Sequence, residues 1–175
     1  MSETQKTILP VLIRRMTLED VDAVHAIETA TFRTPWSRAD FEHEMTKNPC
    51  ARYLVAETDG RVAAFAGAHI ILDEGHITNI AVLEPFRGQG IGRKITQALL
   101  QYASNLGVSY LTLEVREHNE KAQALYRSLG FFKVGIRKKY YEDTGEDAWI
   151  MVCDKLPQAE EDFTEAETVF IESEE

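Results

Sequence analysis

The sequence predicts a single-domain fold of mixed α/β type. A short apolar run with β-branched residues stops at Pro85, and a glycine-dense loop then leads into a long amphipathic segment, which is typical of a strand, a turn and a helix. Strand-like segments before this loop flank an Asp-Gly pair, and segments after it alternate between strand and helix patterns. We therefore expect an antiparallel first half, followed by a βαβα unit and two closing strands.

The antiparallel half is expected to contain two capped helices. Thr17 with Asp20, and Ser37 with Asp40, each place a hydroxyl side chain ahead of an acidic residue in a first helical turn. The Asp-Gly pair at 59–60 supplies the positive φ values of a tight hairpin turn. The expected elements are an edge strand at 8–14, helices at 17–30 and from 37 to just before Pro49, and a meander of strands at 52–58, 61–72 and 75–82.

Helical spacing returns directly after the glycine-dense loop. Apolar residues from Ile91 to Leu106 recur at steps of four, three and one, and Gly107 suits the end of that helix. Residues 110–116 alternate, so Glu114 and Arg116 share one side of a strand. The remaining expected elements are a helix at 120–129 that Asn119 caps and Gly130 ends, and a hairpin of strands at 131–141 and 148–156 around Asp143-Thr144-Gly145.

The glycine-dense loop suits an anion. Gly88, Gly90 and Gly92 stand at alternate positions, and residues without a β-carbon let successive backbone N–H groups point into one concavity at the start of a helix. A dinucleotide fingerprint would need glycine where Arg93 stands, and a Walker loop would need Gly-Lys-Ser/Thr. The loop is therefore either a cradle of another kind for a phosphate or pyrophosphate, or a glycine-rich turn that caps an ordinary helix.

Composition indicates a soluble globular protein. Hydrophobic residues make up 44% and charged residues 27% of the 175 residues, enough for one domain with a sizeable core, and no apolar run approaches the length of a membrane span. The N-terminus lacks a secretory pattern, so we expect a cytoplasmic protein without a membrane partner. Cys50 and Cys153 are not expected to form a disulfide, hold a metal or act as a nucleophile.

The negative charge gathers in one segment. Residues 157–175, the acidic segment, contain eight acidic residues and no Lys or Arg, so only −2 of the formal charge of −10 belongs to residues 1–156. This distribution argues against direct nucleic-acid binding by the segment. We expect one domain at 1–156 and a tail that is either disordered or loosely docked, or that attracts a basic protein substrate. Docking would use Phe163, Val169, Phe170 and Ile171.

Residues 87–92 match the pattern Arg/Gln-x-x-Gly-x-Gly/Ala, and the chain thereby resembles the GNAT superfamily of acyl-CoA N-acyltransferases. Other segments are similar to the ribosomal-protein-alanine N-acetyltransferases of bacteria, and the resemblance extends from about residue 12 to residue 156. These segments are FRTPWS at 32–37, NIAV at 79–82, LEVR at 113–116, Asn119, ALYRSLGF at 124–131 and the pair Tyr140-Tyr141.

The resemblance implies a reaction and a cofactor site. It implies two central parallel strands that splay apart, and transfer of an acetyl group from acetyl-CoA, with coenzyme A as product, to the N-terminal amine of a protein such as the N-terminal alanine of a small-subunit ribosomal protein. A strand N–H near Ala81 and Val82 would polarise the thioester. Asn119 would bind the cofactor, cap its helix, or do both. By the same resemblance the pyrophosphate contacts Gly88, Gln89, Gly90, Ile91, Gly92 and Arg93, and the pantetheine arm lies along Ile80, Ala81 and Val82.

Candidate catalytic and acceptor residues follow from the same resemblance. Glu114 would be the general base, although a carboxylate paired with Arg116 is the alternative. Tyr126 would be the general acid toward the leaving sulfur, although its helical spacing also suits a core tyrosine. Phe32, Trp36, Tyr140 and Tyr141 would line the acceptor site, or else cover the core or surface as ordinary aromatic residues.

The sequence leaves other functions open. The five histidines form no i,i+4 pair or Cys/His cluster, and there is no Gly-x-Ser-x-Gly motif, so we expect no metal and a direct transfer without a covalent enzyme intermediate. The alternatives are an acetyltransferase for lysine side chains or for a small amine, and a non-catalytic acyl-CoA-binding module. Oligomeric state is left open.

Overall fold

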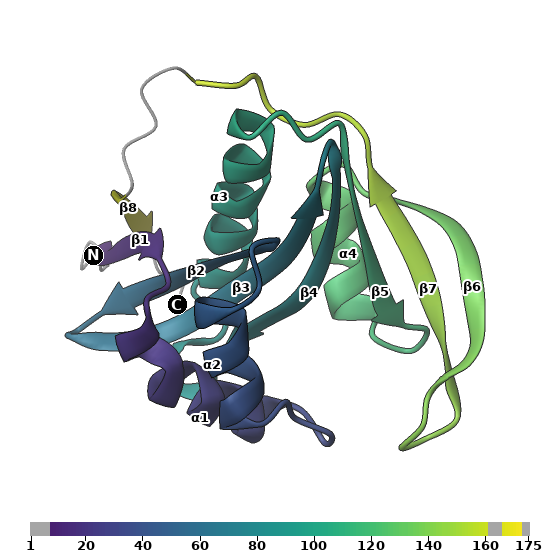
Figure 1. The fold of residues 1–175 in the computed structure, drawn as a ribbon, viewed down its shortest axis with the longest axis horizontal. Coiled ribbons are helices and arrows are strands. Elements are labelled where there is room, and N and C mark those ends of the chain that lie inside the picture. Colours follow the sequence, from purple (N-terminus) through teal and green to yellow (C-terminus); the bar gives the residue numbers. More distant parts are fainter. Residues whose placement is uncertain (1–7, 161–165, 173–175) are drawn as a thin grey trace, which may run out of the picture.

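The protein folds as one mixed sheet with helices on both faces (Figure 1), which confirms the predicted α/β class. The computed structural model describes residues 10–160 and the backbone of 8–9 and 166–172. The eight-stranded sheet has the order β6-β7-β5-β4-β3-β2-β1-β8. The strands are β1 (Ile8–Arg15), β2 (Ala51–Thr58), β3 (Arg61–Ile71), β4 (Glu74–Val82), β5 (Tyr110–Arg116), β6 (Phe132–Tyr141), β7 (Glu146–Cys153) and β8 (Ala166–Glu172). The helices are α1 (Val21–Thr31), α2 (Arg38–Thr46), α3 (Ile91–Asn105) and α4 (Glu120–Ser128), with 3-10 turns η1 (Leu18–Asp20) and η2 (Glu84–Phe86).

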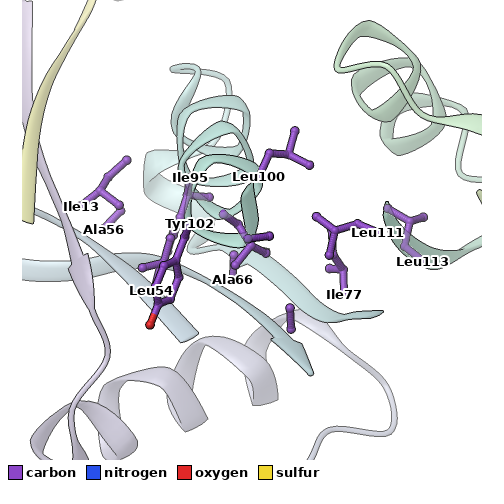
Figure 2. Close-up of a cluster of buried hydrophobic side chains, with 14 of the residues drawn as sticks. Ile13, Leu54, Ala56, Ala66, Ile77, Ile95, Leu100, Tyr102, Leu111 and Leu113 are labelled. Carbon is purple, nitrogen blue, oxygen red and sulfur yellow. The ribbon is translucent and has the colours of Figure 1, made fainter. Parts of the chain in front are cut away.

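Helices cover the two faces of the sheet and define two cores. α3 and α4 lie on one face and α1 and α2 on the other (Figure 1). Ile95 and Leu99 of α3 are fully buried against apolar side chains from β1 to β5, part of which Figure 2 shows. Phe41 of α2 is fully buried against the ring of Phe65 in β3, with the ring centroids 5.7 Å apart. Both faces of the central strands are therefore covered, which explains their continuous burial.

The predicted helix caps are present. Ser37 accepts a hydrogen bond from the backbone N–H of Asp40 at 3.1 Å, and Asp40 accepts one from the Ser37 N–H at 2.8 Å. Thr17 and Asp20 form the corresponding box, but the residues between them make a 3-10 turn before the α-helix starts at Val21. Asn119 accepts a hydrogen bond from the backbone N–H of Ala122 at 3.2 Å. Local side-chain chemistry therefore fixes the starts of α2 and α4 and of the 3-10 turn that leads into α1.

The two central strands splay apart. β4 and β5 are the parallel pair, and their residues pair only at Glu74↔Tyr110, Gly75↔Leu111 and His76↔Thr112. Both strands continue beyond that point, to Val82 and Arg116. The C-terminal half of β4 is thus paired with β3 on one side, and its other side faces a gap between β4 and β5.

A bulge in β4 re-aims the side chains beside this gap. The register with β3 passes from Ala68↔Ile77 to Gly67↔Asn79, so Thr78 is the extra residue. Ile77 packs in the core under α3, whereas Ala81 packs in the core under α1 and α2. A bulge switches the alternation of a strand, and here it turns Asn79 toward α1.

The acidic segment contributes a strand. β8 pairs antiparallel with β1, from Ile8↔Glu172 to Arg14↔Ala166, so the expectation that residues 8–14 form an edge strand is wrong. Before β8, the carbonyl of Gln158 accepts a hydrogen bond from Gln101 in α3 at 2.9 Å. The predicted contact residues Val169, Phe170 and Ile171 fall within β8, and Phe163 lies outside the described residues. A domain boundary at residue 156 stays a prediction.

None of the helices in the described ranges is long and apolar enough to cross a membrane.

Candidate active site

The glycine-dense loop has the geometry of an anion cradle. Gly88 and Gly90 take φ values of +76° and +82°, in the region that favours glycine, and Gly90 is the N-cap of α3. Within the described ranges, the backbone N–H groups from Gly88 to Arg93 donate no hydrogen bond to another residue. These amides lie at the positive end of a fifteen-residue helix, with the side chain of Arg93 exposed beside them. The loop therefore satisfies the requirements for binding a pyrophosphate.

Arg87 anchors this loop instead of extending into it. Its Nε donates a hydrogen bond to the carbonyl of Val82 at 2.7 Å, and a second guanidinium nitrogen lies 3.4 Å from Thr31 Oγ1 in α1. The arginine of the motif thus ties the loop to the end of β4 and to α1. Because it occupies the Val82 carbonyl, the free backbone groups that face the gap belong to residues before Val82, such as Ile80, whereas those of Ala81 point toward β3.

Glu114 lies at the gap with one histidine and one arginine as partners. Its side chain points away from the core that contains Leu113 and Val115, toward the face that carries α1 and α2. His76 Nε2 of β4 lies 2.6 Å from Glu114 Oε2, and Arg137 Nε of β6 lies 3.3 Å from Glu114 Oε1. The hydrogen bond from His76 is the main cause that lowers the pKa of Glu114 below its usual value, against the opposing effect of burial.

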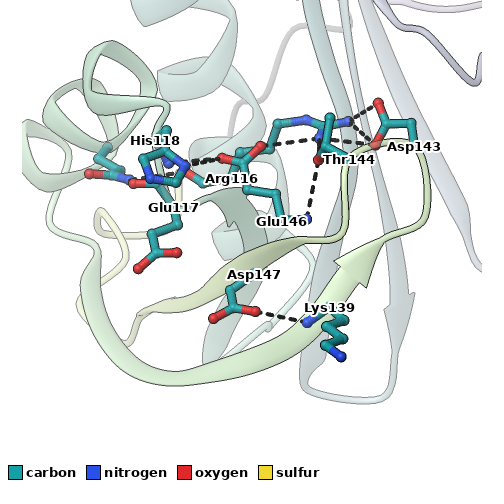
Figure 3. A network of polar contacts seen from close by, with 9 residues as sticks. Arg116, Glu117, His118, Lys139, Asp143, Thr144, Glu146 and Asp147 are labelled. Carbon is teal, nitrogen blue, oxygen red and sulfur yellow. Dashed lines mark hydrogen bonds and ion pairs between the residues drawn. The ribbon is translucent and has the colours of Figure 1, made fainter.

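Arg116 does not pair with Glu114, so that alternative is wrong. Its guanidinium lies 2.9 Å from Asp143 Oδ2 and 3.4 Å from Glu146 Oε1, at the turn between β6 and β7 (Figure 3). It also stacks 4.0 Å from the centroid of the Tyr141 ring. Arg116 therefore fixes the position of the last hairpin and of one candidate acceptor residue.

Tyr126 lies on the opposite face of the sheet from Glu114. It belongs to α4, packs against the core under α3, and its ring lies 5.8 Å from that of Phe131. Burial raises the pKa of Tyr126 to about 12. The phenol is therefore protonated at neutral pH, as both a core tyrosine and a hydrogen-bond donor to a leaving group would be.

Tyr140 and Tyr141 stand on a bulge of β6. The register with β7 passes from Arg137↔Ala148 to Tyr141↔Glu146, and Lys139 takes a φ of +51°. Asp147 holds the bulge because its Oδ1 accepts a hydrogen bond from the Lys139 N–H at 2.8 Å. The two tyrosine rings meet edge to face at 5.1 Å, and Tyr140 is 44% exposed.

The loop between α1 and α2 contains Phe32 and Trp36. The Phe32 side chain is 38% exposed, whereas Trp36 is half-buried and its ring lies 5.4 Å from Phe41. The Trp36 N–H donates a hydrogen bond to Glu28 Oε1 at 3.2 Å. Trp36 thus covers the core as the alternative predicted, and Phe32 is the more accessible of the two.

Glu28 is a buried carboxylate beside the bulge of β4. It is 2% exposed, and it accepts hydrogen bonds from Asn79 Nδ2 at 3.3 and 3.4 Å. The Oδ1 atom of Asn79 is buried without a hydrogen-bond partner. Burial raises the pKa of Glu28 above its usual value, and the bonds from Trp36 and Asn79 counteract this shift only in part.

The amino-acid sequence matches a family model described as Acetyltransferase (GNAT) family over residues 21–131, more than half of the chain. The chain belongs to the GNAT acetyltransferase family. Within the GNAT fold, the gap between β4 and β5 has the glycine loop at one end and Glu114 on one face, and Tyr126 packs on the opposite face of the sheet.

Individual relatives of this GNAT chain are similar over most of their length. A protein of Bacillus subtilis (strain 168), provisionally named ribosomal protein bS18-alanine N-acetyltransferase, is 44% identical over 139 residues, which cover 79% of this chain and 92% of the relative. The ribosomal protein bS18-alanine N-acetyltransferase of Escherichia coli (strain K12) is 40% identical over 136 residues, 75% of this chain and 89% of that protein. The crystal structure of the ribosomal-protein-S18-alanine N-acetyltransferase from Escherichia coli superposes with a TM-score of 0.77 at 34% identity, covering 88% of this chain and 99% of that one.

Sequence reasoning missed four residues of this GNAT site. His76 and Arg137 reach Glu114 from two other strands, and only the strand order brings them together. The burial of Glu28 could have been predicted, because it stands at helical spacing from the buried Val21 and Val24. The direction of the Asn79 side chain could not have been predicted from the sequence pattern, because it depends on the bulge in β4. Among the described residues, no group of three or more His, Cys, Asp or Glu is placed to hold a metal ion, and Cys50 and Cys153 are free.

Proposed function

We propose that this protein is an acetyl-CoA-dependent Nα-acetyltransferase of the cytoplasm. Its acceptor is the N-terminal amine of a protein, namely the N-terminal alanine of a small-subunit ribosomal protein. The observation that carries the proposal is the gap between β4 and β5, with an anion cradle at its end, a carboxylate on one face and a phenol on the opposite face of the sheet. The names of the relatives support the choice of acceptor.

The donor fits the free backbone groups of the site. The pyrophosphate of acetyl-CoA would accept hydrogen bonds from the unbonded amides between Gly88 and Arg93. Its amide-rich pantetheine arm would run along the open side of β4 past Ile80 and Ala81, and pair there with the free backbone groups of Ile80, in place of the missing strand. Holding donor and acceptor in this way can supply ~7–11 kcal/mol of the barrier through positioning alone. Asn119, which caps α4, would add a contact from the far side of the gap.

Glu114 and Tyr126 would divide the proton chemistry. Glu114 supports removal of a proton from the incoming amine through a water, and the protonated phenol of Tyr126 donates a hydrogen bond to the leaving sulfur. An α-amine has a pKa of about 7.7–8.0 and a lysine amine one of about 10.4, so the α-amine costs about 3 kcal/mol less to deprotonate at neutral pH. This difference favours an N-terminal acceptor.

The acceptor would enter between two segments that approach each other. The carboxyl pKa of Asp143, in the turn after β6, is lowered chiefly by Arg116 and also by Arg33 of the α1–α2 loop. The loop with Phe32 therefore lies near the turn of the hairpin that contains Tyr140, and Phe32 and Tyr140 are both exposed. Aromatic walls of this kind suit the first residues of a peptide.

The test is a panel of acceptors. The full-length protein is incubated with acetyl-CoA and peptides that begin with Ala, Ser or Met, and with an N-terminally blocked peptide that contains an internal lysine. We expect acetylation of the Ala-peptide above the others and none of the blocked peptide, measured by mass spectrometry and by thiol release. Acetylation of the blocked peptide alone would overturn the Nα assignment.

A further inference from the structure

Glu114 by itself is a poor match to the base that the proposed reaction needs. Both of its oxygens already have a nitrogen partner, with Oε2 2.6 Å from His76 Nε2 and Oε1 3.3 Å from Arg137 Nε, and its side chain is only 12% exposed. These partners lower the pKa of Glu114 below its usual value, which weakens its affinity for a proton. A general base works best when its pKa lies near the working pH.

His76 has the two properties that Glu114 lacks, which are an exposed side chain and a free acceptor atom. It is the last residue of β4 that pairs with β5 before the strands separate, and its side chain is 42% exposed, much more than that of Glu114. An ionised carboxylate can only accept, so Nε2 of neutral His76 carries the hydrogen that binds Glu114 Oε2. Its Nδ1 is then an acceptor, and no described residue donates a hydrogen bond to it.

We infer that His76 and Glu114 act as one proton-accepting unit, in which Nδ1 of His76 takes the proton of the acceptor amine through a water and Glu114 balances the imidazolium charge. This inference rests on the proposed function. It assigns His76 as the proton acceptor and Glu114 as the residue that sets its tautomer and orientation.

The proton count closes without another reactant. The amine arrives as an ammonium and gives one proton through the water to His76. The neutral amine forms the C–N bond to the acetyl carbon, the C–S bond breaks, and its electron pair leaves on sulfur. The second proton lost by the nitrogen is matched by the proton that the sulfur gains as a thiol. His76 releases its proton to solvent, which its exposure allows.

Other charged groups around His76 must be separated from it in any pH experiment. His69 of β3 pairs with it across the sheet, and His69 itself bonds to Glu44 of α2 at 2.5 Å. Imidazoles as a class change charge between pH 5 and 8, so His69 needs a control variant of its own in an experiment on pH dependence. Other groups that face His76 or its partner are Glu74, which bonds to Tyr110, and Arg137, Tyr140 and Tyr141 of β6.

The decisive experiment compares three histidine-to-glutamine variants over pH. His76→Gln still offers an N–H to Glu114 but cannot accept a proton near neutral pH. We expect its kcat on the Ala-peptide to fall by about 10²-fold at pH 7, with loss of the acid limb of kcat/KM. The deficit should shrink above the pKa of the α-amine, at about pH 9, where the amine no longer needs a base. Coenzyme A affinity, measured by calorimetry, should stay at the wild-type value.

Two matched controls assign the effect. His69→Gln removes the neighbouring imidazole and should keep the acid limb. His43→Gln changes an exposed imidazole on α2 and should leave kcat unchanged. A deficit of His76→Gln that is constant over pH would show a purely structural role and overturn the inference, as would wild-type turnover in that variant.

The failure of the proposed function gives a different result. If the unmodified protein acetylates no peptide of the panel, the proposed function falls and this role falls with it. If it acetylates the Ala-peptide and His76→Gln does so equally, only this role falls. A ¹⁵N spectrum of the imidazoles gives a readout without turnover: Nε2 of neutral His76 should be protonated in the wild type, and an Nδ1-protonated tautomer would contradict the dyad.

Discussion

Glu28 is a residue whose buried position lowers the stability of the fold. It is almost fully buried beside Asn79, and the pKa of its carboxyl is raised because burial outweighs the two hydrogen-bonding groups that face it. A charged carboxylate in such a position is tolerated only with partners, and the unpartnered Asn79 Oδ1 adds to the cost. Residues of this kind are retained at functional sites at the expense of stability.

We predict a pH-dependent gain in stability for Glu28→Gln. Because the folded pKa of Glu28 lies above its usual value of 4.5, its contribution to stability is fully present below pH 4.5 and is lost as pH rises through the raised value. The glutamine amide keeps an acceptor for the Trp36 N–H without the charge, so the variant should match wild type near pH 4 and exceed it by about 1 kcal/mol at pH 7.

Urea unfolding at several pH values measures this difference. Glu28→Ala is the control, since it leaves the Trp36 N–H without its acceptor and should be destabilised at every pH. A Glu28→Gln variant that is less stable than wild type at pH 7 would contradict the reasoning.

Glu114 and Tyr126 give the second prediction at this scale. Glu114→Gln and Tyr126→Phe should each lower kcat by about 10²-fold, since each removes one part of the proton chemistry. Neither side chain belongs to the loop that would bind pyrophosphate, so coenzyme A affinity should stay within about twofold of the wild-type value. Turnover and calorimetry on the same preparations provide the check, and loss of coenzyme A binding in both variants would indicate a damaged fold.

The candidate site could be predicted from the sequence only where local pattern decides direction. The alternation of β5 placed Glu114 on the face away from Leu113, as the structure has it. Its partners depended on which strands become neighbours, so pairing with Arg116 was the natural and wrong alternative. Contacts across a sheet are not encoded in a single strand.

At the scale of elements, the loop before α3 depends on backbone conformation more than on glycine count. Gly90 takes a φ of +82°, whereas Gly92 is helical and a methyl group there would lie 3.6 Å from Val82, an ordinary contact. Gly90 and Gly92 therefore have different structural roles. Gly90 sets the cradle and Gly92 opens the first turn of the helix.

Alanine at these two positions gives the third prediction. Gly90→Ala should be destabilised by about 1–2 kcal/mol, because a β-carbon disfavours the left-handed conformation, and should weaken coenzyme A binding as the amides turn away. Gly92→Ala should fold with at least wild-type stability, because alanine is the better helix former. Thermal melts with and without coenzyme A compare the two, and equal melting temperatures for both variants would show that the left-handed turn is not required.

The bulge of β6 could not be predicted from any local sequence pattern. Lys139 is a non-glycine residue at positive φ, and the Asp147 carboxylate that accepts its N–H comes from the neighbouring strand. The hairpin itself could be predicted from Asp143-Thr144-Gly145, although β7 starts at Glu146, before the predicted Ala148. Turn chemistry is local, whereas strand length and bulges depend on the partner strand.

At the scale of the whole molecule, the order of elements could be predicted but the arrangement could not. Periodicity and caps identified the helices and the meander, because both are properties of short segments. The splay of β4 from β5 depends on pairing that stops after His76, and it followed only from resemblance to a family. The strand in the acidic segment was missed because charge there outweighs its few apolar residues.

Removal of the acidic segment separates stability from catalysis. β8 covers one side of β1, and β1, β2 and β3 stand between it and the gap beside β4. A chain that ends at Leu156 should therefore lose about 1–2 kcal/mol of stability and melt about 2–8 °C lower, because β1 becomes an edge strand. Its kcat/KM on a short peptide should stay within about twofold of the wild-type value, since no residue of the candidate site is removed.

A second truncation, after Glu160, divides the two contacts that the acidic segment makes. It keeps the hydrogen bonds that join Gln158 and Glu160 to Gln101 and Asn105 of α3, and removes residues 161–175, which include β8. If the pairing of β8 with β1 provides the stabilisation, both truncated chains should melt at the same temperature. A higher melting temperature for the longer chain would show that the contacts with α3 also contribute to stability. A large loss of kcat/KM below the melting temperature would show that the acidic segment is part of the catalytic fold. The segment is too far along the sheet to affect catalysis by contact with the candidate site.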